Sequence, residues 1–404
     1  MNRLSKKFLL LLFPLLAVFL IAITIFNARI DPFSAYPSLR RSSLNQSVHA
    51  MPSVRGRAEL LRQDQSHTLM LGSSIMAVGF DPEDLPPFMQ DGGAFNSALD
   101  GNTLPELLAA LKRAIRRPMP PKHIILTFDN YWLFNAQAHT QGFRESILNP
   151  ELSQAEYHFA NLLGYKATEK SIAILSGAEP AFNNRGRRTR PLTKPGSPQA
   201  PAFNEPLPTP NPAALCALAT EYNINVNPAD TVYQQSQTIN LALLQQFIFL
   251  SQINHIKTTI ILPPLHVSAL DNMEQQNLWP LWQQGKRKLT ELVANENSLK
   301  HEEEGMPEAE LWDFALINNM TIETIPSSVD PAARMNNFWD PVHITRAAGA
   351  RILKTIFNPE HSNTQPPLGI QITQDNISDH LESVRLDYEI YFAITPDSPD
   401  IPTE

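Results

Sequence analysis

The chain has 404 residues, of which 43% are hydrophobic, so it is long enough to bury the core of one large domain or of two smaller ones. Its net charge of −8 and the lack of long Lys/Arg runs in its body argue against a nucleic-acid partner. The single cysteine, Cys216, excludes an intrachain disulfide and a multi-cysteine metal site, and its apolar neighbours predict a small buried hydrophobe.

The first feature along the chain is an uncharged apolar run of 19 residues, from Phe8 to Phe26. A helix of about 20 such residues crosses a bilayer, and Arg3, Lys6 and Lys7 predict that the N-terminal flank stays in the cytoplasm. A cleaved signal peptide is the alternative, but the run is longer than the usual ~7–15 residue signal core and no clear A-x-A site follows it. We therefore expect residues 1–30 to form a single-span anchor. With one cysteine in the chain, we expect a bacterial inner membrane, with the body in the periplasm or extracytoplasmic space.

The rest of the chain alternates apolar strands with helical patterns, after a polar stalk at residues 31–65 that ends in a short helix. We expect strands at 67–72, 122–128 and 257–264, helices at 103–117, 236–255 and 345–357, and a buried segment at 310–314. This alternation implies βαβ units, and therefore a three-layer α/β/α fold with a parallel central sheet in addition to the transmembrane helix. Ligands of such sheets bind at the carboxyl ends of the strands.

Two segments interrupt or follow this body, which we place at residues 66–360. The first is a proline-rich insertion at about 178–213, which contains the basic cluster RGRRTR. An exposed insertion loop and a binding lid for an anionic glycan are both consistent with its composition. The second is the C-terminal segment 361–404, which we expect to form a helix packed on the body, followed by a tail.

Two short motifs carry the candidate chemistry. The strand at 67–72 ends at a glycine followed by Ser73 and Ser74, so one of these serines is either a turn residue or a nucleophile. Far along the chain, Asp340 and His343 are three residues apart, and on a turn both side chains can face the same way. A carboxylate that holds an imidazole in one tautomer makes it a general base for a hydroxyl nucleophile.

Together with two intervening blocks, these motifs resemble the SGNH (GDSL-type) hydrolase superfamily. The four stretches are LGSS after the first strand, AFNSALDGNT, a strand ending at FDN, and the late WDPVH. The resemblance implies that Ser74 is the nucleophile, that Ser73 replaces the superfamily's aspartate, and that His343 is the base oriented by Asp340. The second block falls on Asn96, Ala98 and Gly101.

The resemblance also implies an oxyanion hole, formed by the amides of Ser74 and Ala98 and by a side chain at Asp129 or Asn130. The superfamily's asparagine falls on Asp129, and an ionised carboxylate there would repel a developing negative charge. Three interpretations stay open: the register slips by one and Asn130 donates, Asp129 has a structural role, or the site is weakened. Gly101 and His266 are candidate substrate contacts. For His266, just after the third strand, a structural loop histidine is the alternative.

The closer likeness is to membrane-anchored extracytoplasmic members that act in O-acylation of envelope polysaccharides, such as the D-alanyl-lipoteichoic acid transfer proteins. It implies an acyl esterase or O-acyltransferase that acts on an envelope or exported polysaccharide. The alternatives are a catalytically degenerate scaffold and an adaptor for a multi-span membrane acyltransferase. Expected partners are therefore the membrane, a glycan or acyl-donor substrate, and such an acyltransferase. We expect no cofactor and no metal site, because no cluster of ligand residues stands out.

Overall fold

The structure is a computed structural model, and it describes residues 3–40, 47–140, 142–178, 182–189, 209–299, 305–325, 335–358 and 367–394. Most of the proline-rich insertion, residues 190–208, and the tail after residue 394 lie outside the described residues. The chain divides into two compact units. The N-terminal unit is Met1–Asp64 with Gln141–Asn184, and the sheet unit is Gln65–Thr140 with Arg185–Glu404.

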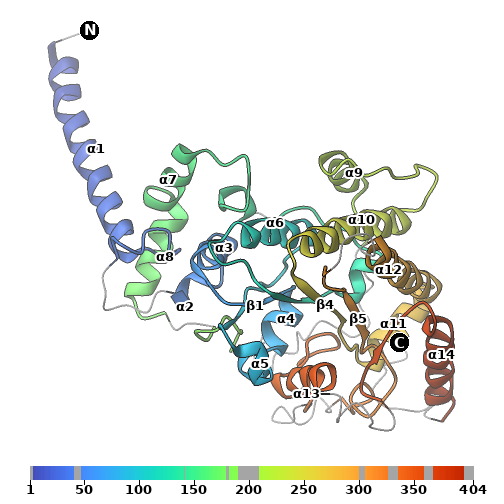
Figure 1. The fold of residues 1–404 in the computed structure, drawn as a ribbon. Helices are drawn as coiled ribbons and strands as arrows, with labels where there is room; N and C mark the ends of the chain where they lie inside the picture. The colour runs from blue at the N-terminus through green and yellow to red at the C-terminus, as the bar shows by residue number, and fades with distance from the viewer. Residues whose placement is uncertain are drawn as a thin grey trace. The chain divides into compact units, whose positions relative to one another are not determined.

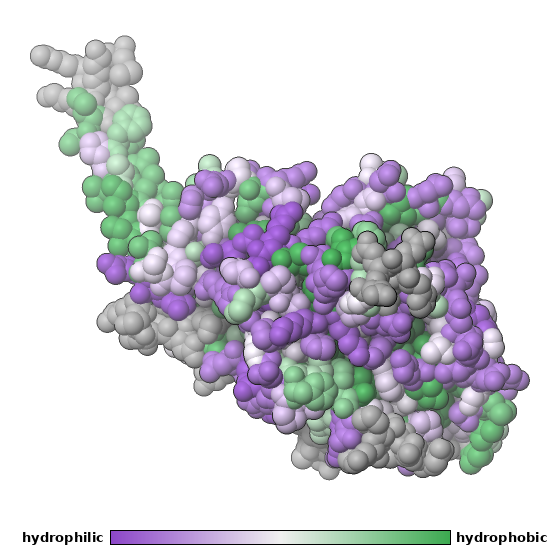
Figure 2. Space-filling model, in the orientation of Figure 1, coloured by the Kyte–Doolittle hydropathy of each residue, from purple (hydrophilic) through white to green (hydrophobic). Residues whose placement is uncertain are grey.

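The N-terminal unit is helical (Figure 1). Its helices are α1 (Arg3–Ile30), α2 (Ser47–Ala50), α3 (Val54–Gln63), the 3-10 helix η3 (Phe143–Glu145), α7 (Gln154–Leu162) and α8 (Tyr165–Leu175). Within the described residues, one helix is long and apolar enough to cross a membrane, at Leu10–Ile30, and a signal sequence would pass the same test. Figure 2 shows most of this helix as an apolar column.

The segment expected to be a polar stalk differs from that prediction, because it carries buried side chains. Phe33 and Met51 are buried, and the guanidinium of Arg55 lies 3.9 Å from the centre of the Phe33 ring. Arg55 also bonds to Glu145 and Asn161, each at 2.8 Å. These partners come from residues 141–184, which we had placed in the body. Long-range contacts of one buried arginine therefore join segments that look unrelated in sequence.

The described part of the sheet unit contains a six-stranded sheet, with strand order β2-β1-β3-β4-β5-β6. The strands are β1 (Thr68–Leu71), β2 (Ala94–Asn96), β3 (His123–Thr127), β4 (Lys257–Leu262), β5 (Glu310–Asp313) and β6 (Ile370–Gln371). All pairs are parallel except that of β5 with the edge strand β6. The predicted α/β class and its mostly parallel sheet are confirmed, and the antiparallel edge is an addition.

Helices surround this sheet. They are α4 (Ser74–Gly79), η1 (Pro82–Asp84), α5 (Pro87–Gln90), α6 (Leu104–Ile115), η2 (Asn130–Leu133), α9 (Pro212–Glu221), α10 (Val232–Ile253), α11 (Val267–Gln275), α12 (Trp279–Leu299), α13 (Arg346–Phe357) and α14 (Ile377–Ile394). α10 contacts β4, α6 and α12, whereas α4 contacts β3 and α13. The predicted helices at 103–117, 236–255 and 345–357 are present as α6, α10 and α13. Cys216 on α9 is exposed, contrary to the buried hydrophobe expected from its neighbours.

The strand order determines where a ligand would meet this sheet. β2 lies on one side of β1, and β3 lies on the other. The connections that leave β1 and β3 therefore run to opposite sides of the sheet, so the topological switch point lies between these two strands. In open parallel sheets, the carboxyl ends of the strands at such a switch form the usual binding crevice. The turn with Ser73 and Ser74 follows β1, and Asp129 follows β3. The sequence motifs therefore fall at the position that the topology favours.

Candidate active site

The turn after β1 separates the roles of the two serines. A Cβ on Gly72 would lie 2.1 Å from the hydroxyl oxygen of Thr127, so only glycine fits there. Ser73 is the N-cap of α4, because its hydroxyl oxygen accepts from the amide of Ile75 at 3.3 Å. Ser74 is the first residue of the helix, and its hydroxyl is not used as a cap.

The hydroxyl of Ser74 instead faces the late motif. Its oxygen lies 2.8 Å from Nε2 of His343, although the two residues are 269 positions apart in sequence. Nδ1 of His343 lies 2.6 Å from a carboxylate oxygen of Asp340. When Asp340 accepts the Nδ1 hydrogen, Nε2 presents its lone pair to the Ser74 hydroxyl. The structure thus brings together the three residues expected to be nucleophile, base and orienting acid.

Asp340 and His343 occupy the tip of a short antiparallel turn. Phe338 and Ile344 form an isolated β-bridge, and the amide of Trp339 donates to the carbonyl of His343 at 2.7 Å. The second carboxylate oxygen of Asp340 accepts from the amide of His343 at 2.9 Å. The same aspartate therefore orients both the backbone and the ring of the histidine.

His266 packs against this turn and is buried. Its amide donates to the carbonyl of Pro341 at 2.9 Å, and its ring contacts Phe338 edge-on. Nδ1 accepts from the amide of Ser268 at 3.2 Å, and Nε2 lies 2.7 Å from the carbonyl of Glu323. With 3% of its surface exposed, His266 matches the structural alternative and not the expected substrate contact.

Burial and hydrogen bonds set the charges around the imidazole. Burial alone would raise the pKa of Asp340, but hydrogen bonds from the ring and amide of His343 hold it below its ordinary value. Asp129 differs: burial raises its pKa to about 6, although Ser73 and His343 both act to lower it. Burial, with the charges of Asp340 and Asp129, also raises the pKa of Tyr131, so this phenol lies within electrostatic reach of both carboxylates.

Asp129 contacts the nucleophile turn through the neighbouring serine. The hydroxyl of Ser73 donates to one carboxylate oxygen of Asp129 at 2.5 Å. The other carboxylate oxygen is buried and has no hydrogen-bond partner among the described residues. Of the three interpretations of this position, the structural hydrogen bond is the one that the geometry supports.

Two of the expected oxyanion donors have other partners. The amide of Ala98 donates to the side-chain oxygen of Asn96 at 3.0 Å. The side chain of Asn130 donates to the carbonyl of Pro263 at 2.8 Å and accepts from the indole of Trp282 at 2.9 Å. Asn130 is 1% exposed, so its side chain stays within the core and the slipped register does not supply a donor.

Asn102, which the sequence reasoning missed, supplies a side-chain amide next to the nucleophile turn. Its Nδ2 donates to the carbonyl of Gly72 at 3.2 Å and carries a second hydrogen. The amide of Ser74 makes no recorded hydrogen bond within the described part of the chain. Gly101, the other expected substrate contact, is exposed, with a φ of +73° that favours glycine. The only sequence signal for Asn102 was its place in a turn before a helix.

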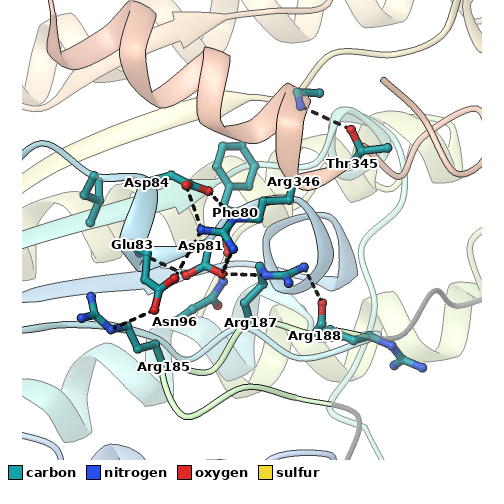
Figure 3. Close-up of polar contacts among 12 residues, drawn as sticks. Phe80, Asp81, Glu83, Asp84, Asn96, Arg185, Arg187, Arg188, Thr345 and Arg346 are labelled. Carbon is teal, nitrogen blue, oxygen red and sulfur yellow. Dashed lines mark hydrogen bonds and ion pairs between the residues drawn. The ribbon is translucent and has the colours of Figure 1, made fainter. Parts of the chain in front are cut away.

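Ion pairs connect the segment just after α4, which begins at Ser74, to α13, the helix that follows His343 (Figure 3). Asp81, just beyond α4, is fully buried and accepts from Arg187 at 2.7 Å, with Arg346 of α13 at 3.4 Å. Arg346 also pairs with Asp84 at 2.8 Å. Arg187 belongs to the basic cluster RGRRTR, and its neighbour Arg188 pairs with Asp100. These guanidinium groups are thus already neutralised, which weakens the lid interpretation of the described part of that cluster.

The same two helices meet backbone to backbone. A Cβ on Gly349 of α13 would lie 1.9 Å from the carbonyl oxygen of Gly79 at the end of α4. A Cβ on Gly79 would in turn meet the Ile344 side chain at 2.4 Å. No side chain fits between the helices here, so their separation is determined by the backbone itself.

Comparison with known proteins adds nothing to this geometry: no protein-family model matches the chain, and no curated protein matches it. Among the described residues, no cluster of three or more His, Cys, Asp or Glu side chains is suited to hold a metal ion.

Proposed function

We propose that this chain is a membrane-anchored, extracytoplasmic acyl esterase or O-acyltransferase of the SGNH type, acting on an envelope or exported polysaccharide. The observation that carries the proposal is the hydrogen-bonded series Ser74–His343–Asp340, with distances of 2.8 and 2.6 Å. A nucleophile, its base and an orienting acid within hydrogen-bond reach are the requirement for acyl transfer through a covalent intermediate.

The fold is consistent with this class. The proposed arrangement has α4 and α13 on one face of the sheet and α6, α10 and α12 on the other, which is the three-layer SGNH form. Contacts support this arrangement. In the first group, α4 contacts α13 and β3; in the second, α10 contacts α6, α12 and β4. The four motifs quoted above supply the remaining likeness.

The proposed reaction begins when the Ser74 oxygen attacks the carbonyl carbon of an acyl ester. The hydroxyl proton moves to Nε2 of His343, and Asp340 stabilises the imidazolium that forms. When the tetrahedral intermediate collapses, His343 returns this proton to the departing alkoxide, and the acyl group remains on Ser74. Water or a glycan hydroxyl then attacks, His343 takes its proton, and that proton finally returns to Ser74.

The oxyanion of each tetrahedral intermediate needs donors. The amide of Ser74 and the second Nδ2 hydrogen of Asn102 are the proposed ones, because both lie at the nucleophile turn and neither has another recorded partner in the described chain. This assignment replaces Ala98, whose single amide hydrogen is used by Asn96, and Asn130, whose side chain is 1% exposed and held in the core by Pro263 and Trp282.

A serine-directed fluorophosphonate probe tests the proposal. We expect the full chain, in detergent, to form one adduct at Ser74 and to hydrolyse a generic acyl ester. Ser74→Ala should lose both properties, whereas Ser298→Ala, at an exposed serine on α12, should retain them. If the native chain neither reacts with the probe nor hydrolyses esters, the catalytic proposal is wrong.

A second candidate, a non-catalytic scaffold on the same fold, is favoured by one observation. Where the superfamily's oxyanion asparagine falls, this chain has a buried carboxylate, Asp129, which is bonded to Ser73. Failure of the probe reaction, in protein that remains folded, would favour this second candidate.

The proposed location is tested with the native cysteine. The apolar run of α1 follows Arg3, Lys6 and Lys7 at the start of the same helix, which supports an orientation with the body outside the cytoplasm. Because Cys216 is exposed, a membrane-impermeant maleimide should label it in intact spheroplasts. Cys216→Ser is the control, and labelling only after permeabilisation would contradict this orientation.

A further inference from the structure

The hairpin of α7 and α8 exposes large apolar side chains. Both helices belong to the N-terminal unit and contact α1. Four residues, which we call the apolar surface, are exposed by half or more: Phe159 at 63%, Tyr165 at 78%, Ile172 at 54% and Leu175 at 53%. Large apolar side chains that gather on one element commonly mark an interaction site, whereas scattered ones do not.

On α8 these side chains form one stripe. At about 100° per residue, Tyr165, Ile172 and Leu175 fall within an arc of about 80°. The buried residues of the helix, Ala167, Ser171 and Ile174, fall on a separate arc of about 60°. That buried arc packs in the unit, and the stripe is left without a partner in the described chain.

The stripe borders the contact with α1. The side chain of Asn27, near the end of α1, is fully buried. It donates to the carbonyl of Leu162 at 2.8 Å and to the hydroxyl of Thr168 at 2.9 Å, and it accepts from the hydroxyl of Ser171 at 2.9 Å. Three hydrogen bonds to one amide hold the hairpin against this end of α1.

The length of α1 places that contact at a definite depth. The uncharged run from Phe8 to Phe26 spans about 28 Å as a helix, close to the ~30 Å of a bilayer's hydrocarbon core. Asn27 is the next residue. A hairpin bonded to Asn27 therefore lies at the bilayer surface whenever α1 spans the membrane.

The neighbouring charges suit a lipid surface. Arg29 on α1 and Lys166 on α8 are both exposed, close to the stripe in sequence. Cationic side chains and tyrosines are the residues that occur at the boundary between lipid head groups and hydrocarbon. On α8, the exposed Glu169 and Lys166 follow Tyr165 at about 40° and about 100° round the helix, so both flank the same edge of the stripe, away from Leu175.

We propose that the α7–α8 hairpin lies on the outer surface of the bilayer that α1 spans, with Phe159, Tyr165, Ile172 and Leu175 inserted at the head-group boundary. This inference rests on the proposed membrane span of α1. It adds a second membrane contact, which would restrict the tilt and rotation of the N-terminal unit relative to the bilayer.

Depth-dependent fluorescence quenching tests the inference on the full chain. In a Cys216→Ser background, single cysteines replace Phe159 or Ile172 and are labelled with an environment-sensitive fluorophore in phosphatidylglycerol–phosphatidylcholine vesicles. Phe88→Cys is the matched control, because Phe88 is 64% exposed and Phe159 is 63% exposed. We expect a head-group nitroxide lipid to quench the labels at 159 and 172 several-fold more strongly than the label at 88.

A label at Val18→Cys on α1 tests the membrane span separately from the surface contact of the hairpin. If this label is quenched by a deep nitroxide while those at 159 and 172 behave like the control, the span holds and the hairpin inference is wrong. If the α1 label is also unquenched, the span itself is wrong. Labels at 159 and 172 that are shielded from both nitroxide lipid and aqueous iodide would indicate a second copy of the chain on this surface, which also overturns the inference.

Discussion

The described part of the sheet unit contains two aspartate–histidine pairs, and they differ in what surrounds the imidazole. In the first, His343 bonds to Asp340 at 2.6 Å, and its Nε2 faces the hydroxyl of Ser74. In the second, His380 of α14 lies 2.8 Å from Asp313 at the end of β5. The side chain of His343 is 16% exposed and that of His380 is 2% exposed.

In the buried pair of Asp313 and His380, a lysine takes the place that the serine hydroxyl has in the first pair. Lys286, completely buried on α12, lies 2.5 Å from the same oxygen of Asp313. Burial would raise the pKa of Asp313, but Lys286 and His380 hold it below its ordinary value. An Asp–His contact is therefore a poor marker of catalysis by itself. What distinguishes the first pair is an accessible ring nitrogen with a hydroxyl against it.

Alanine substitution of each histidine should separate the two pairs most clearly, because one loss should affect activity and the other stability. We expect His343→Ala to lower kcat/KM on an acyl ester by on the order of 10⁴-fold, with little change in stability, because the base is lost. His380→Ala should instead destabilise the fold by about 1–3 kcal/mol and leave the activity of the folded protein intact. Ester kinetics and urea unfolding of the full chain in detergent measure both. Equal activity losses would contradict the distinction.

Removal of the buried cation should have the next largest effect. Lys286→Ala leaves Asp313 charged and without its ion-pair partner in the core, which should cost about 3–5 kcal/mol of unfolding free energy. Lys288→Ala, on the same helix and without a recorded ion pair, should change stability by less than about 0.5 kcal/mol. A small change in unfolding free energy for Lys286→Ala would mean that this buried ion pair does not stabilise the fold.

Loss of the Asn102 amide should slow the reaction without unfolding the site. We expect Asn102→Ala to reduce kcat about 10²-fold with a smaller change in KM, as for one oxyanion donor. Asn102→Gln, which keeps an amide at a different reach, is expected to recover part of the rate. An unchanged kcat in Asn102→Ala would exclude this side chain as a donor.

The pKa of Asp129 is raised and that of Asp313 is lowered, so the pH dependence of stability distinguishes the two buried aspartates. The folded-state pKa of Asp129, about 6, is above its ordinary value of 3.8, so the folded state binds the proton more tightly. The stability from this group is therefore present below about pH 4 and is lost as the pH rises through about 6. Asp129→Asn should reduce the difference in unfolding free energy between pH 5 and pH 7.5 by about 1.4 kcal/mol. The exposed Asp91→Asn is the control, and equal pH dependences in all three proteins would contradict the assignment.

The parts of the site that were predictable are those encoded by local patterns. A strand that stops at Gly72 and a D-x-x-H turn before a capped helix are short-range signals, so the contact of Ser74, Asp340 and His343 could be predicted from the sequence. The sheet class followed for the same reason, from the alternation of strands and helices. Side-chain hydrogen bonds between distant segments have no such pattern. The partners of Ala98 and Asn130 could therefore not be predicted, and neither could the hydrogen bond from Asn102 to the carbonyl of Gly72.

The division of the chain was hidden for a related reason. Residues 141–184 look like further helices of the body, and only their contacts with Arg55 and Asn27 join them to the N-terminal unit. Those contacts involve one or two polar atoms each. Their positions are determined by the folded chain, and hydrophobic periodicity does not reveal them.

The sequence separation of 269 residues between Ser74 and His343 has a consequence for the newly synthesised chain. Strands β1 to β5 all precede His343, so a growing chain can begin to form its sheet, with the turn at Ser74 included, before His343 has been made. Loop-closure entropy delays contacts between such distant residues. If the proposed function is correct, hydrolytic competence arises only after residue 343 has been made, and a chain truncated before residue 340 is inert towards esters.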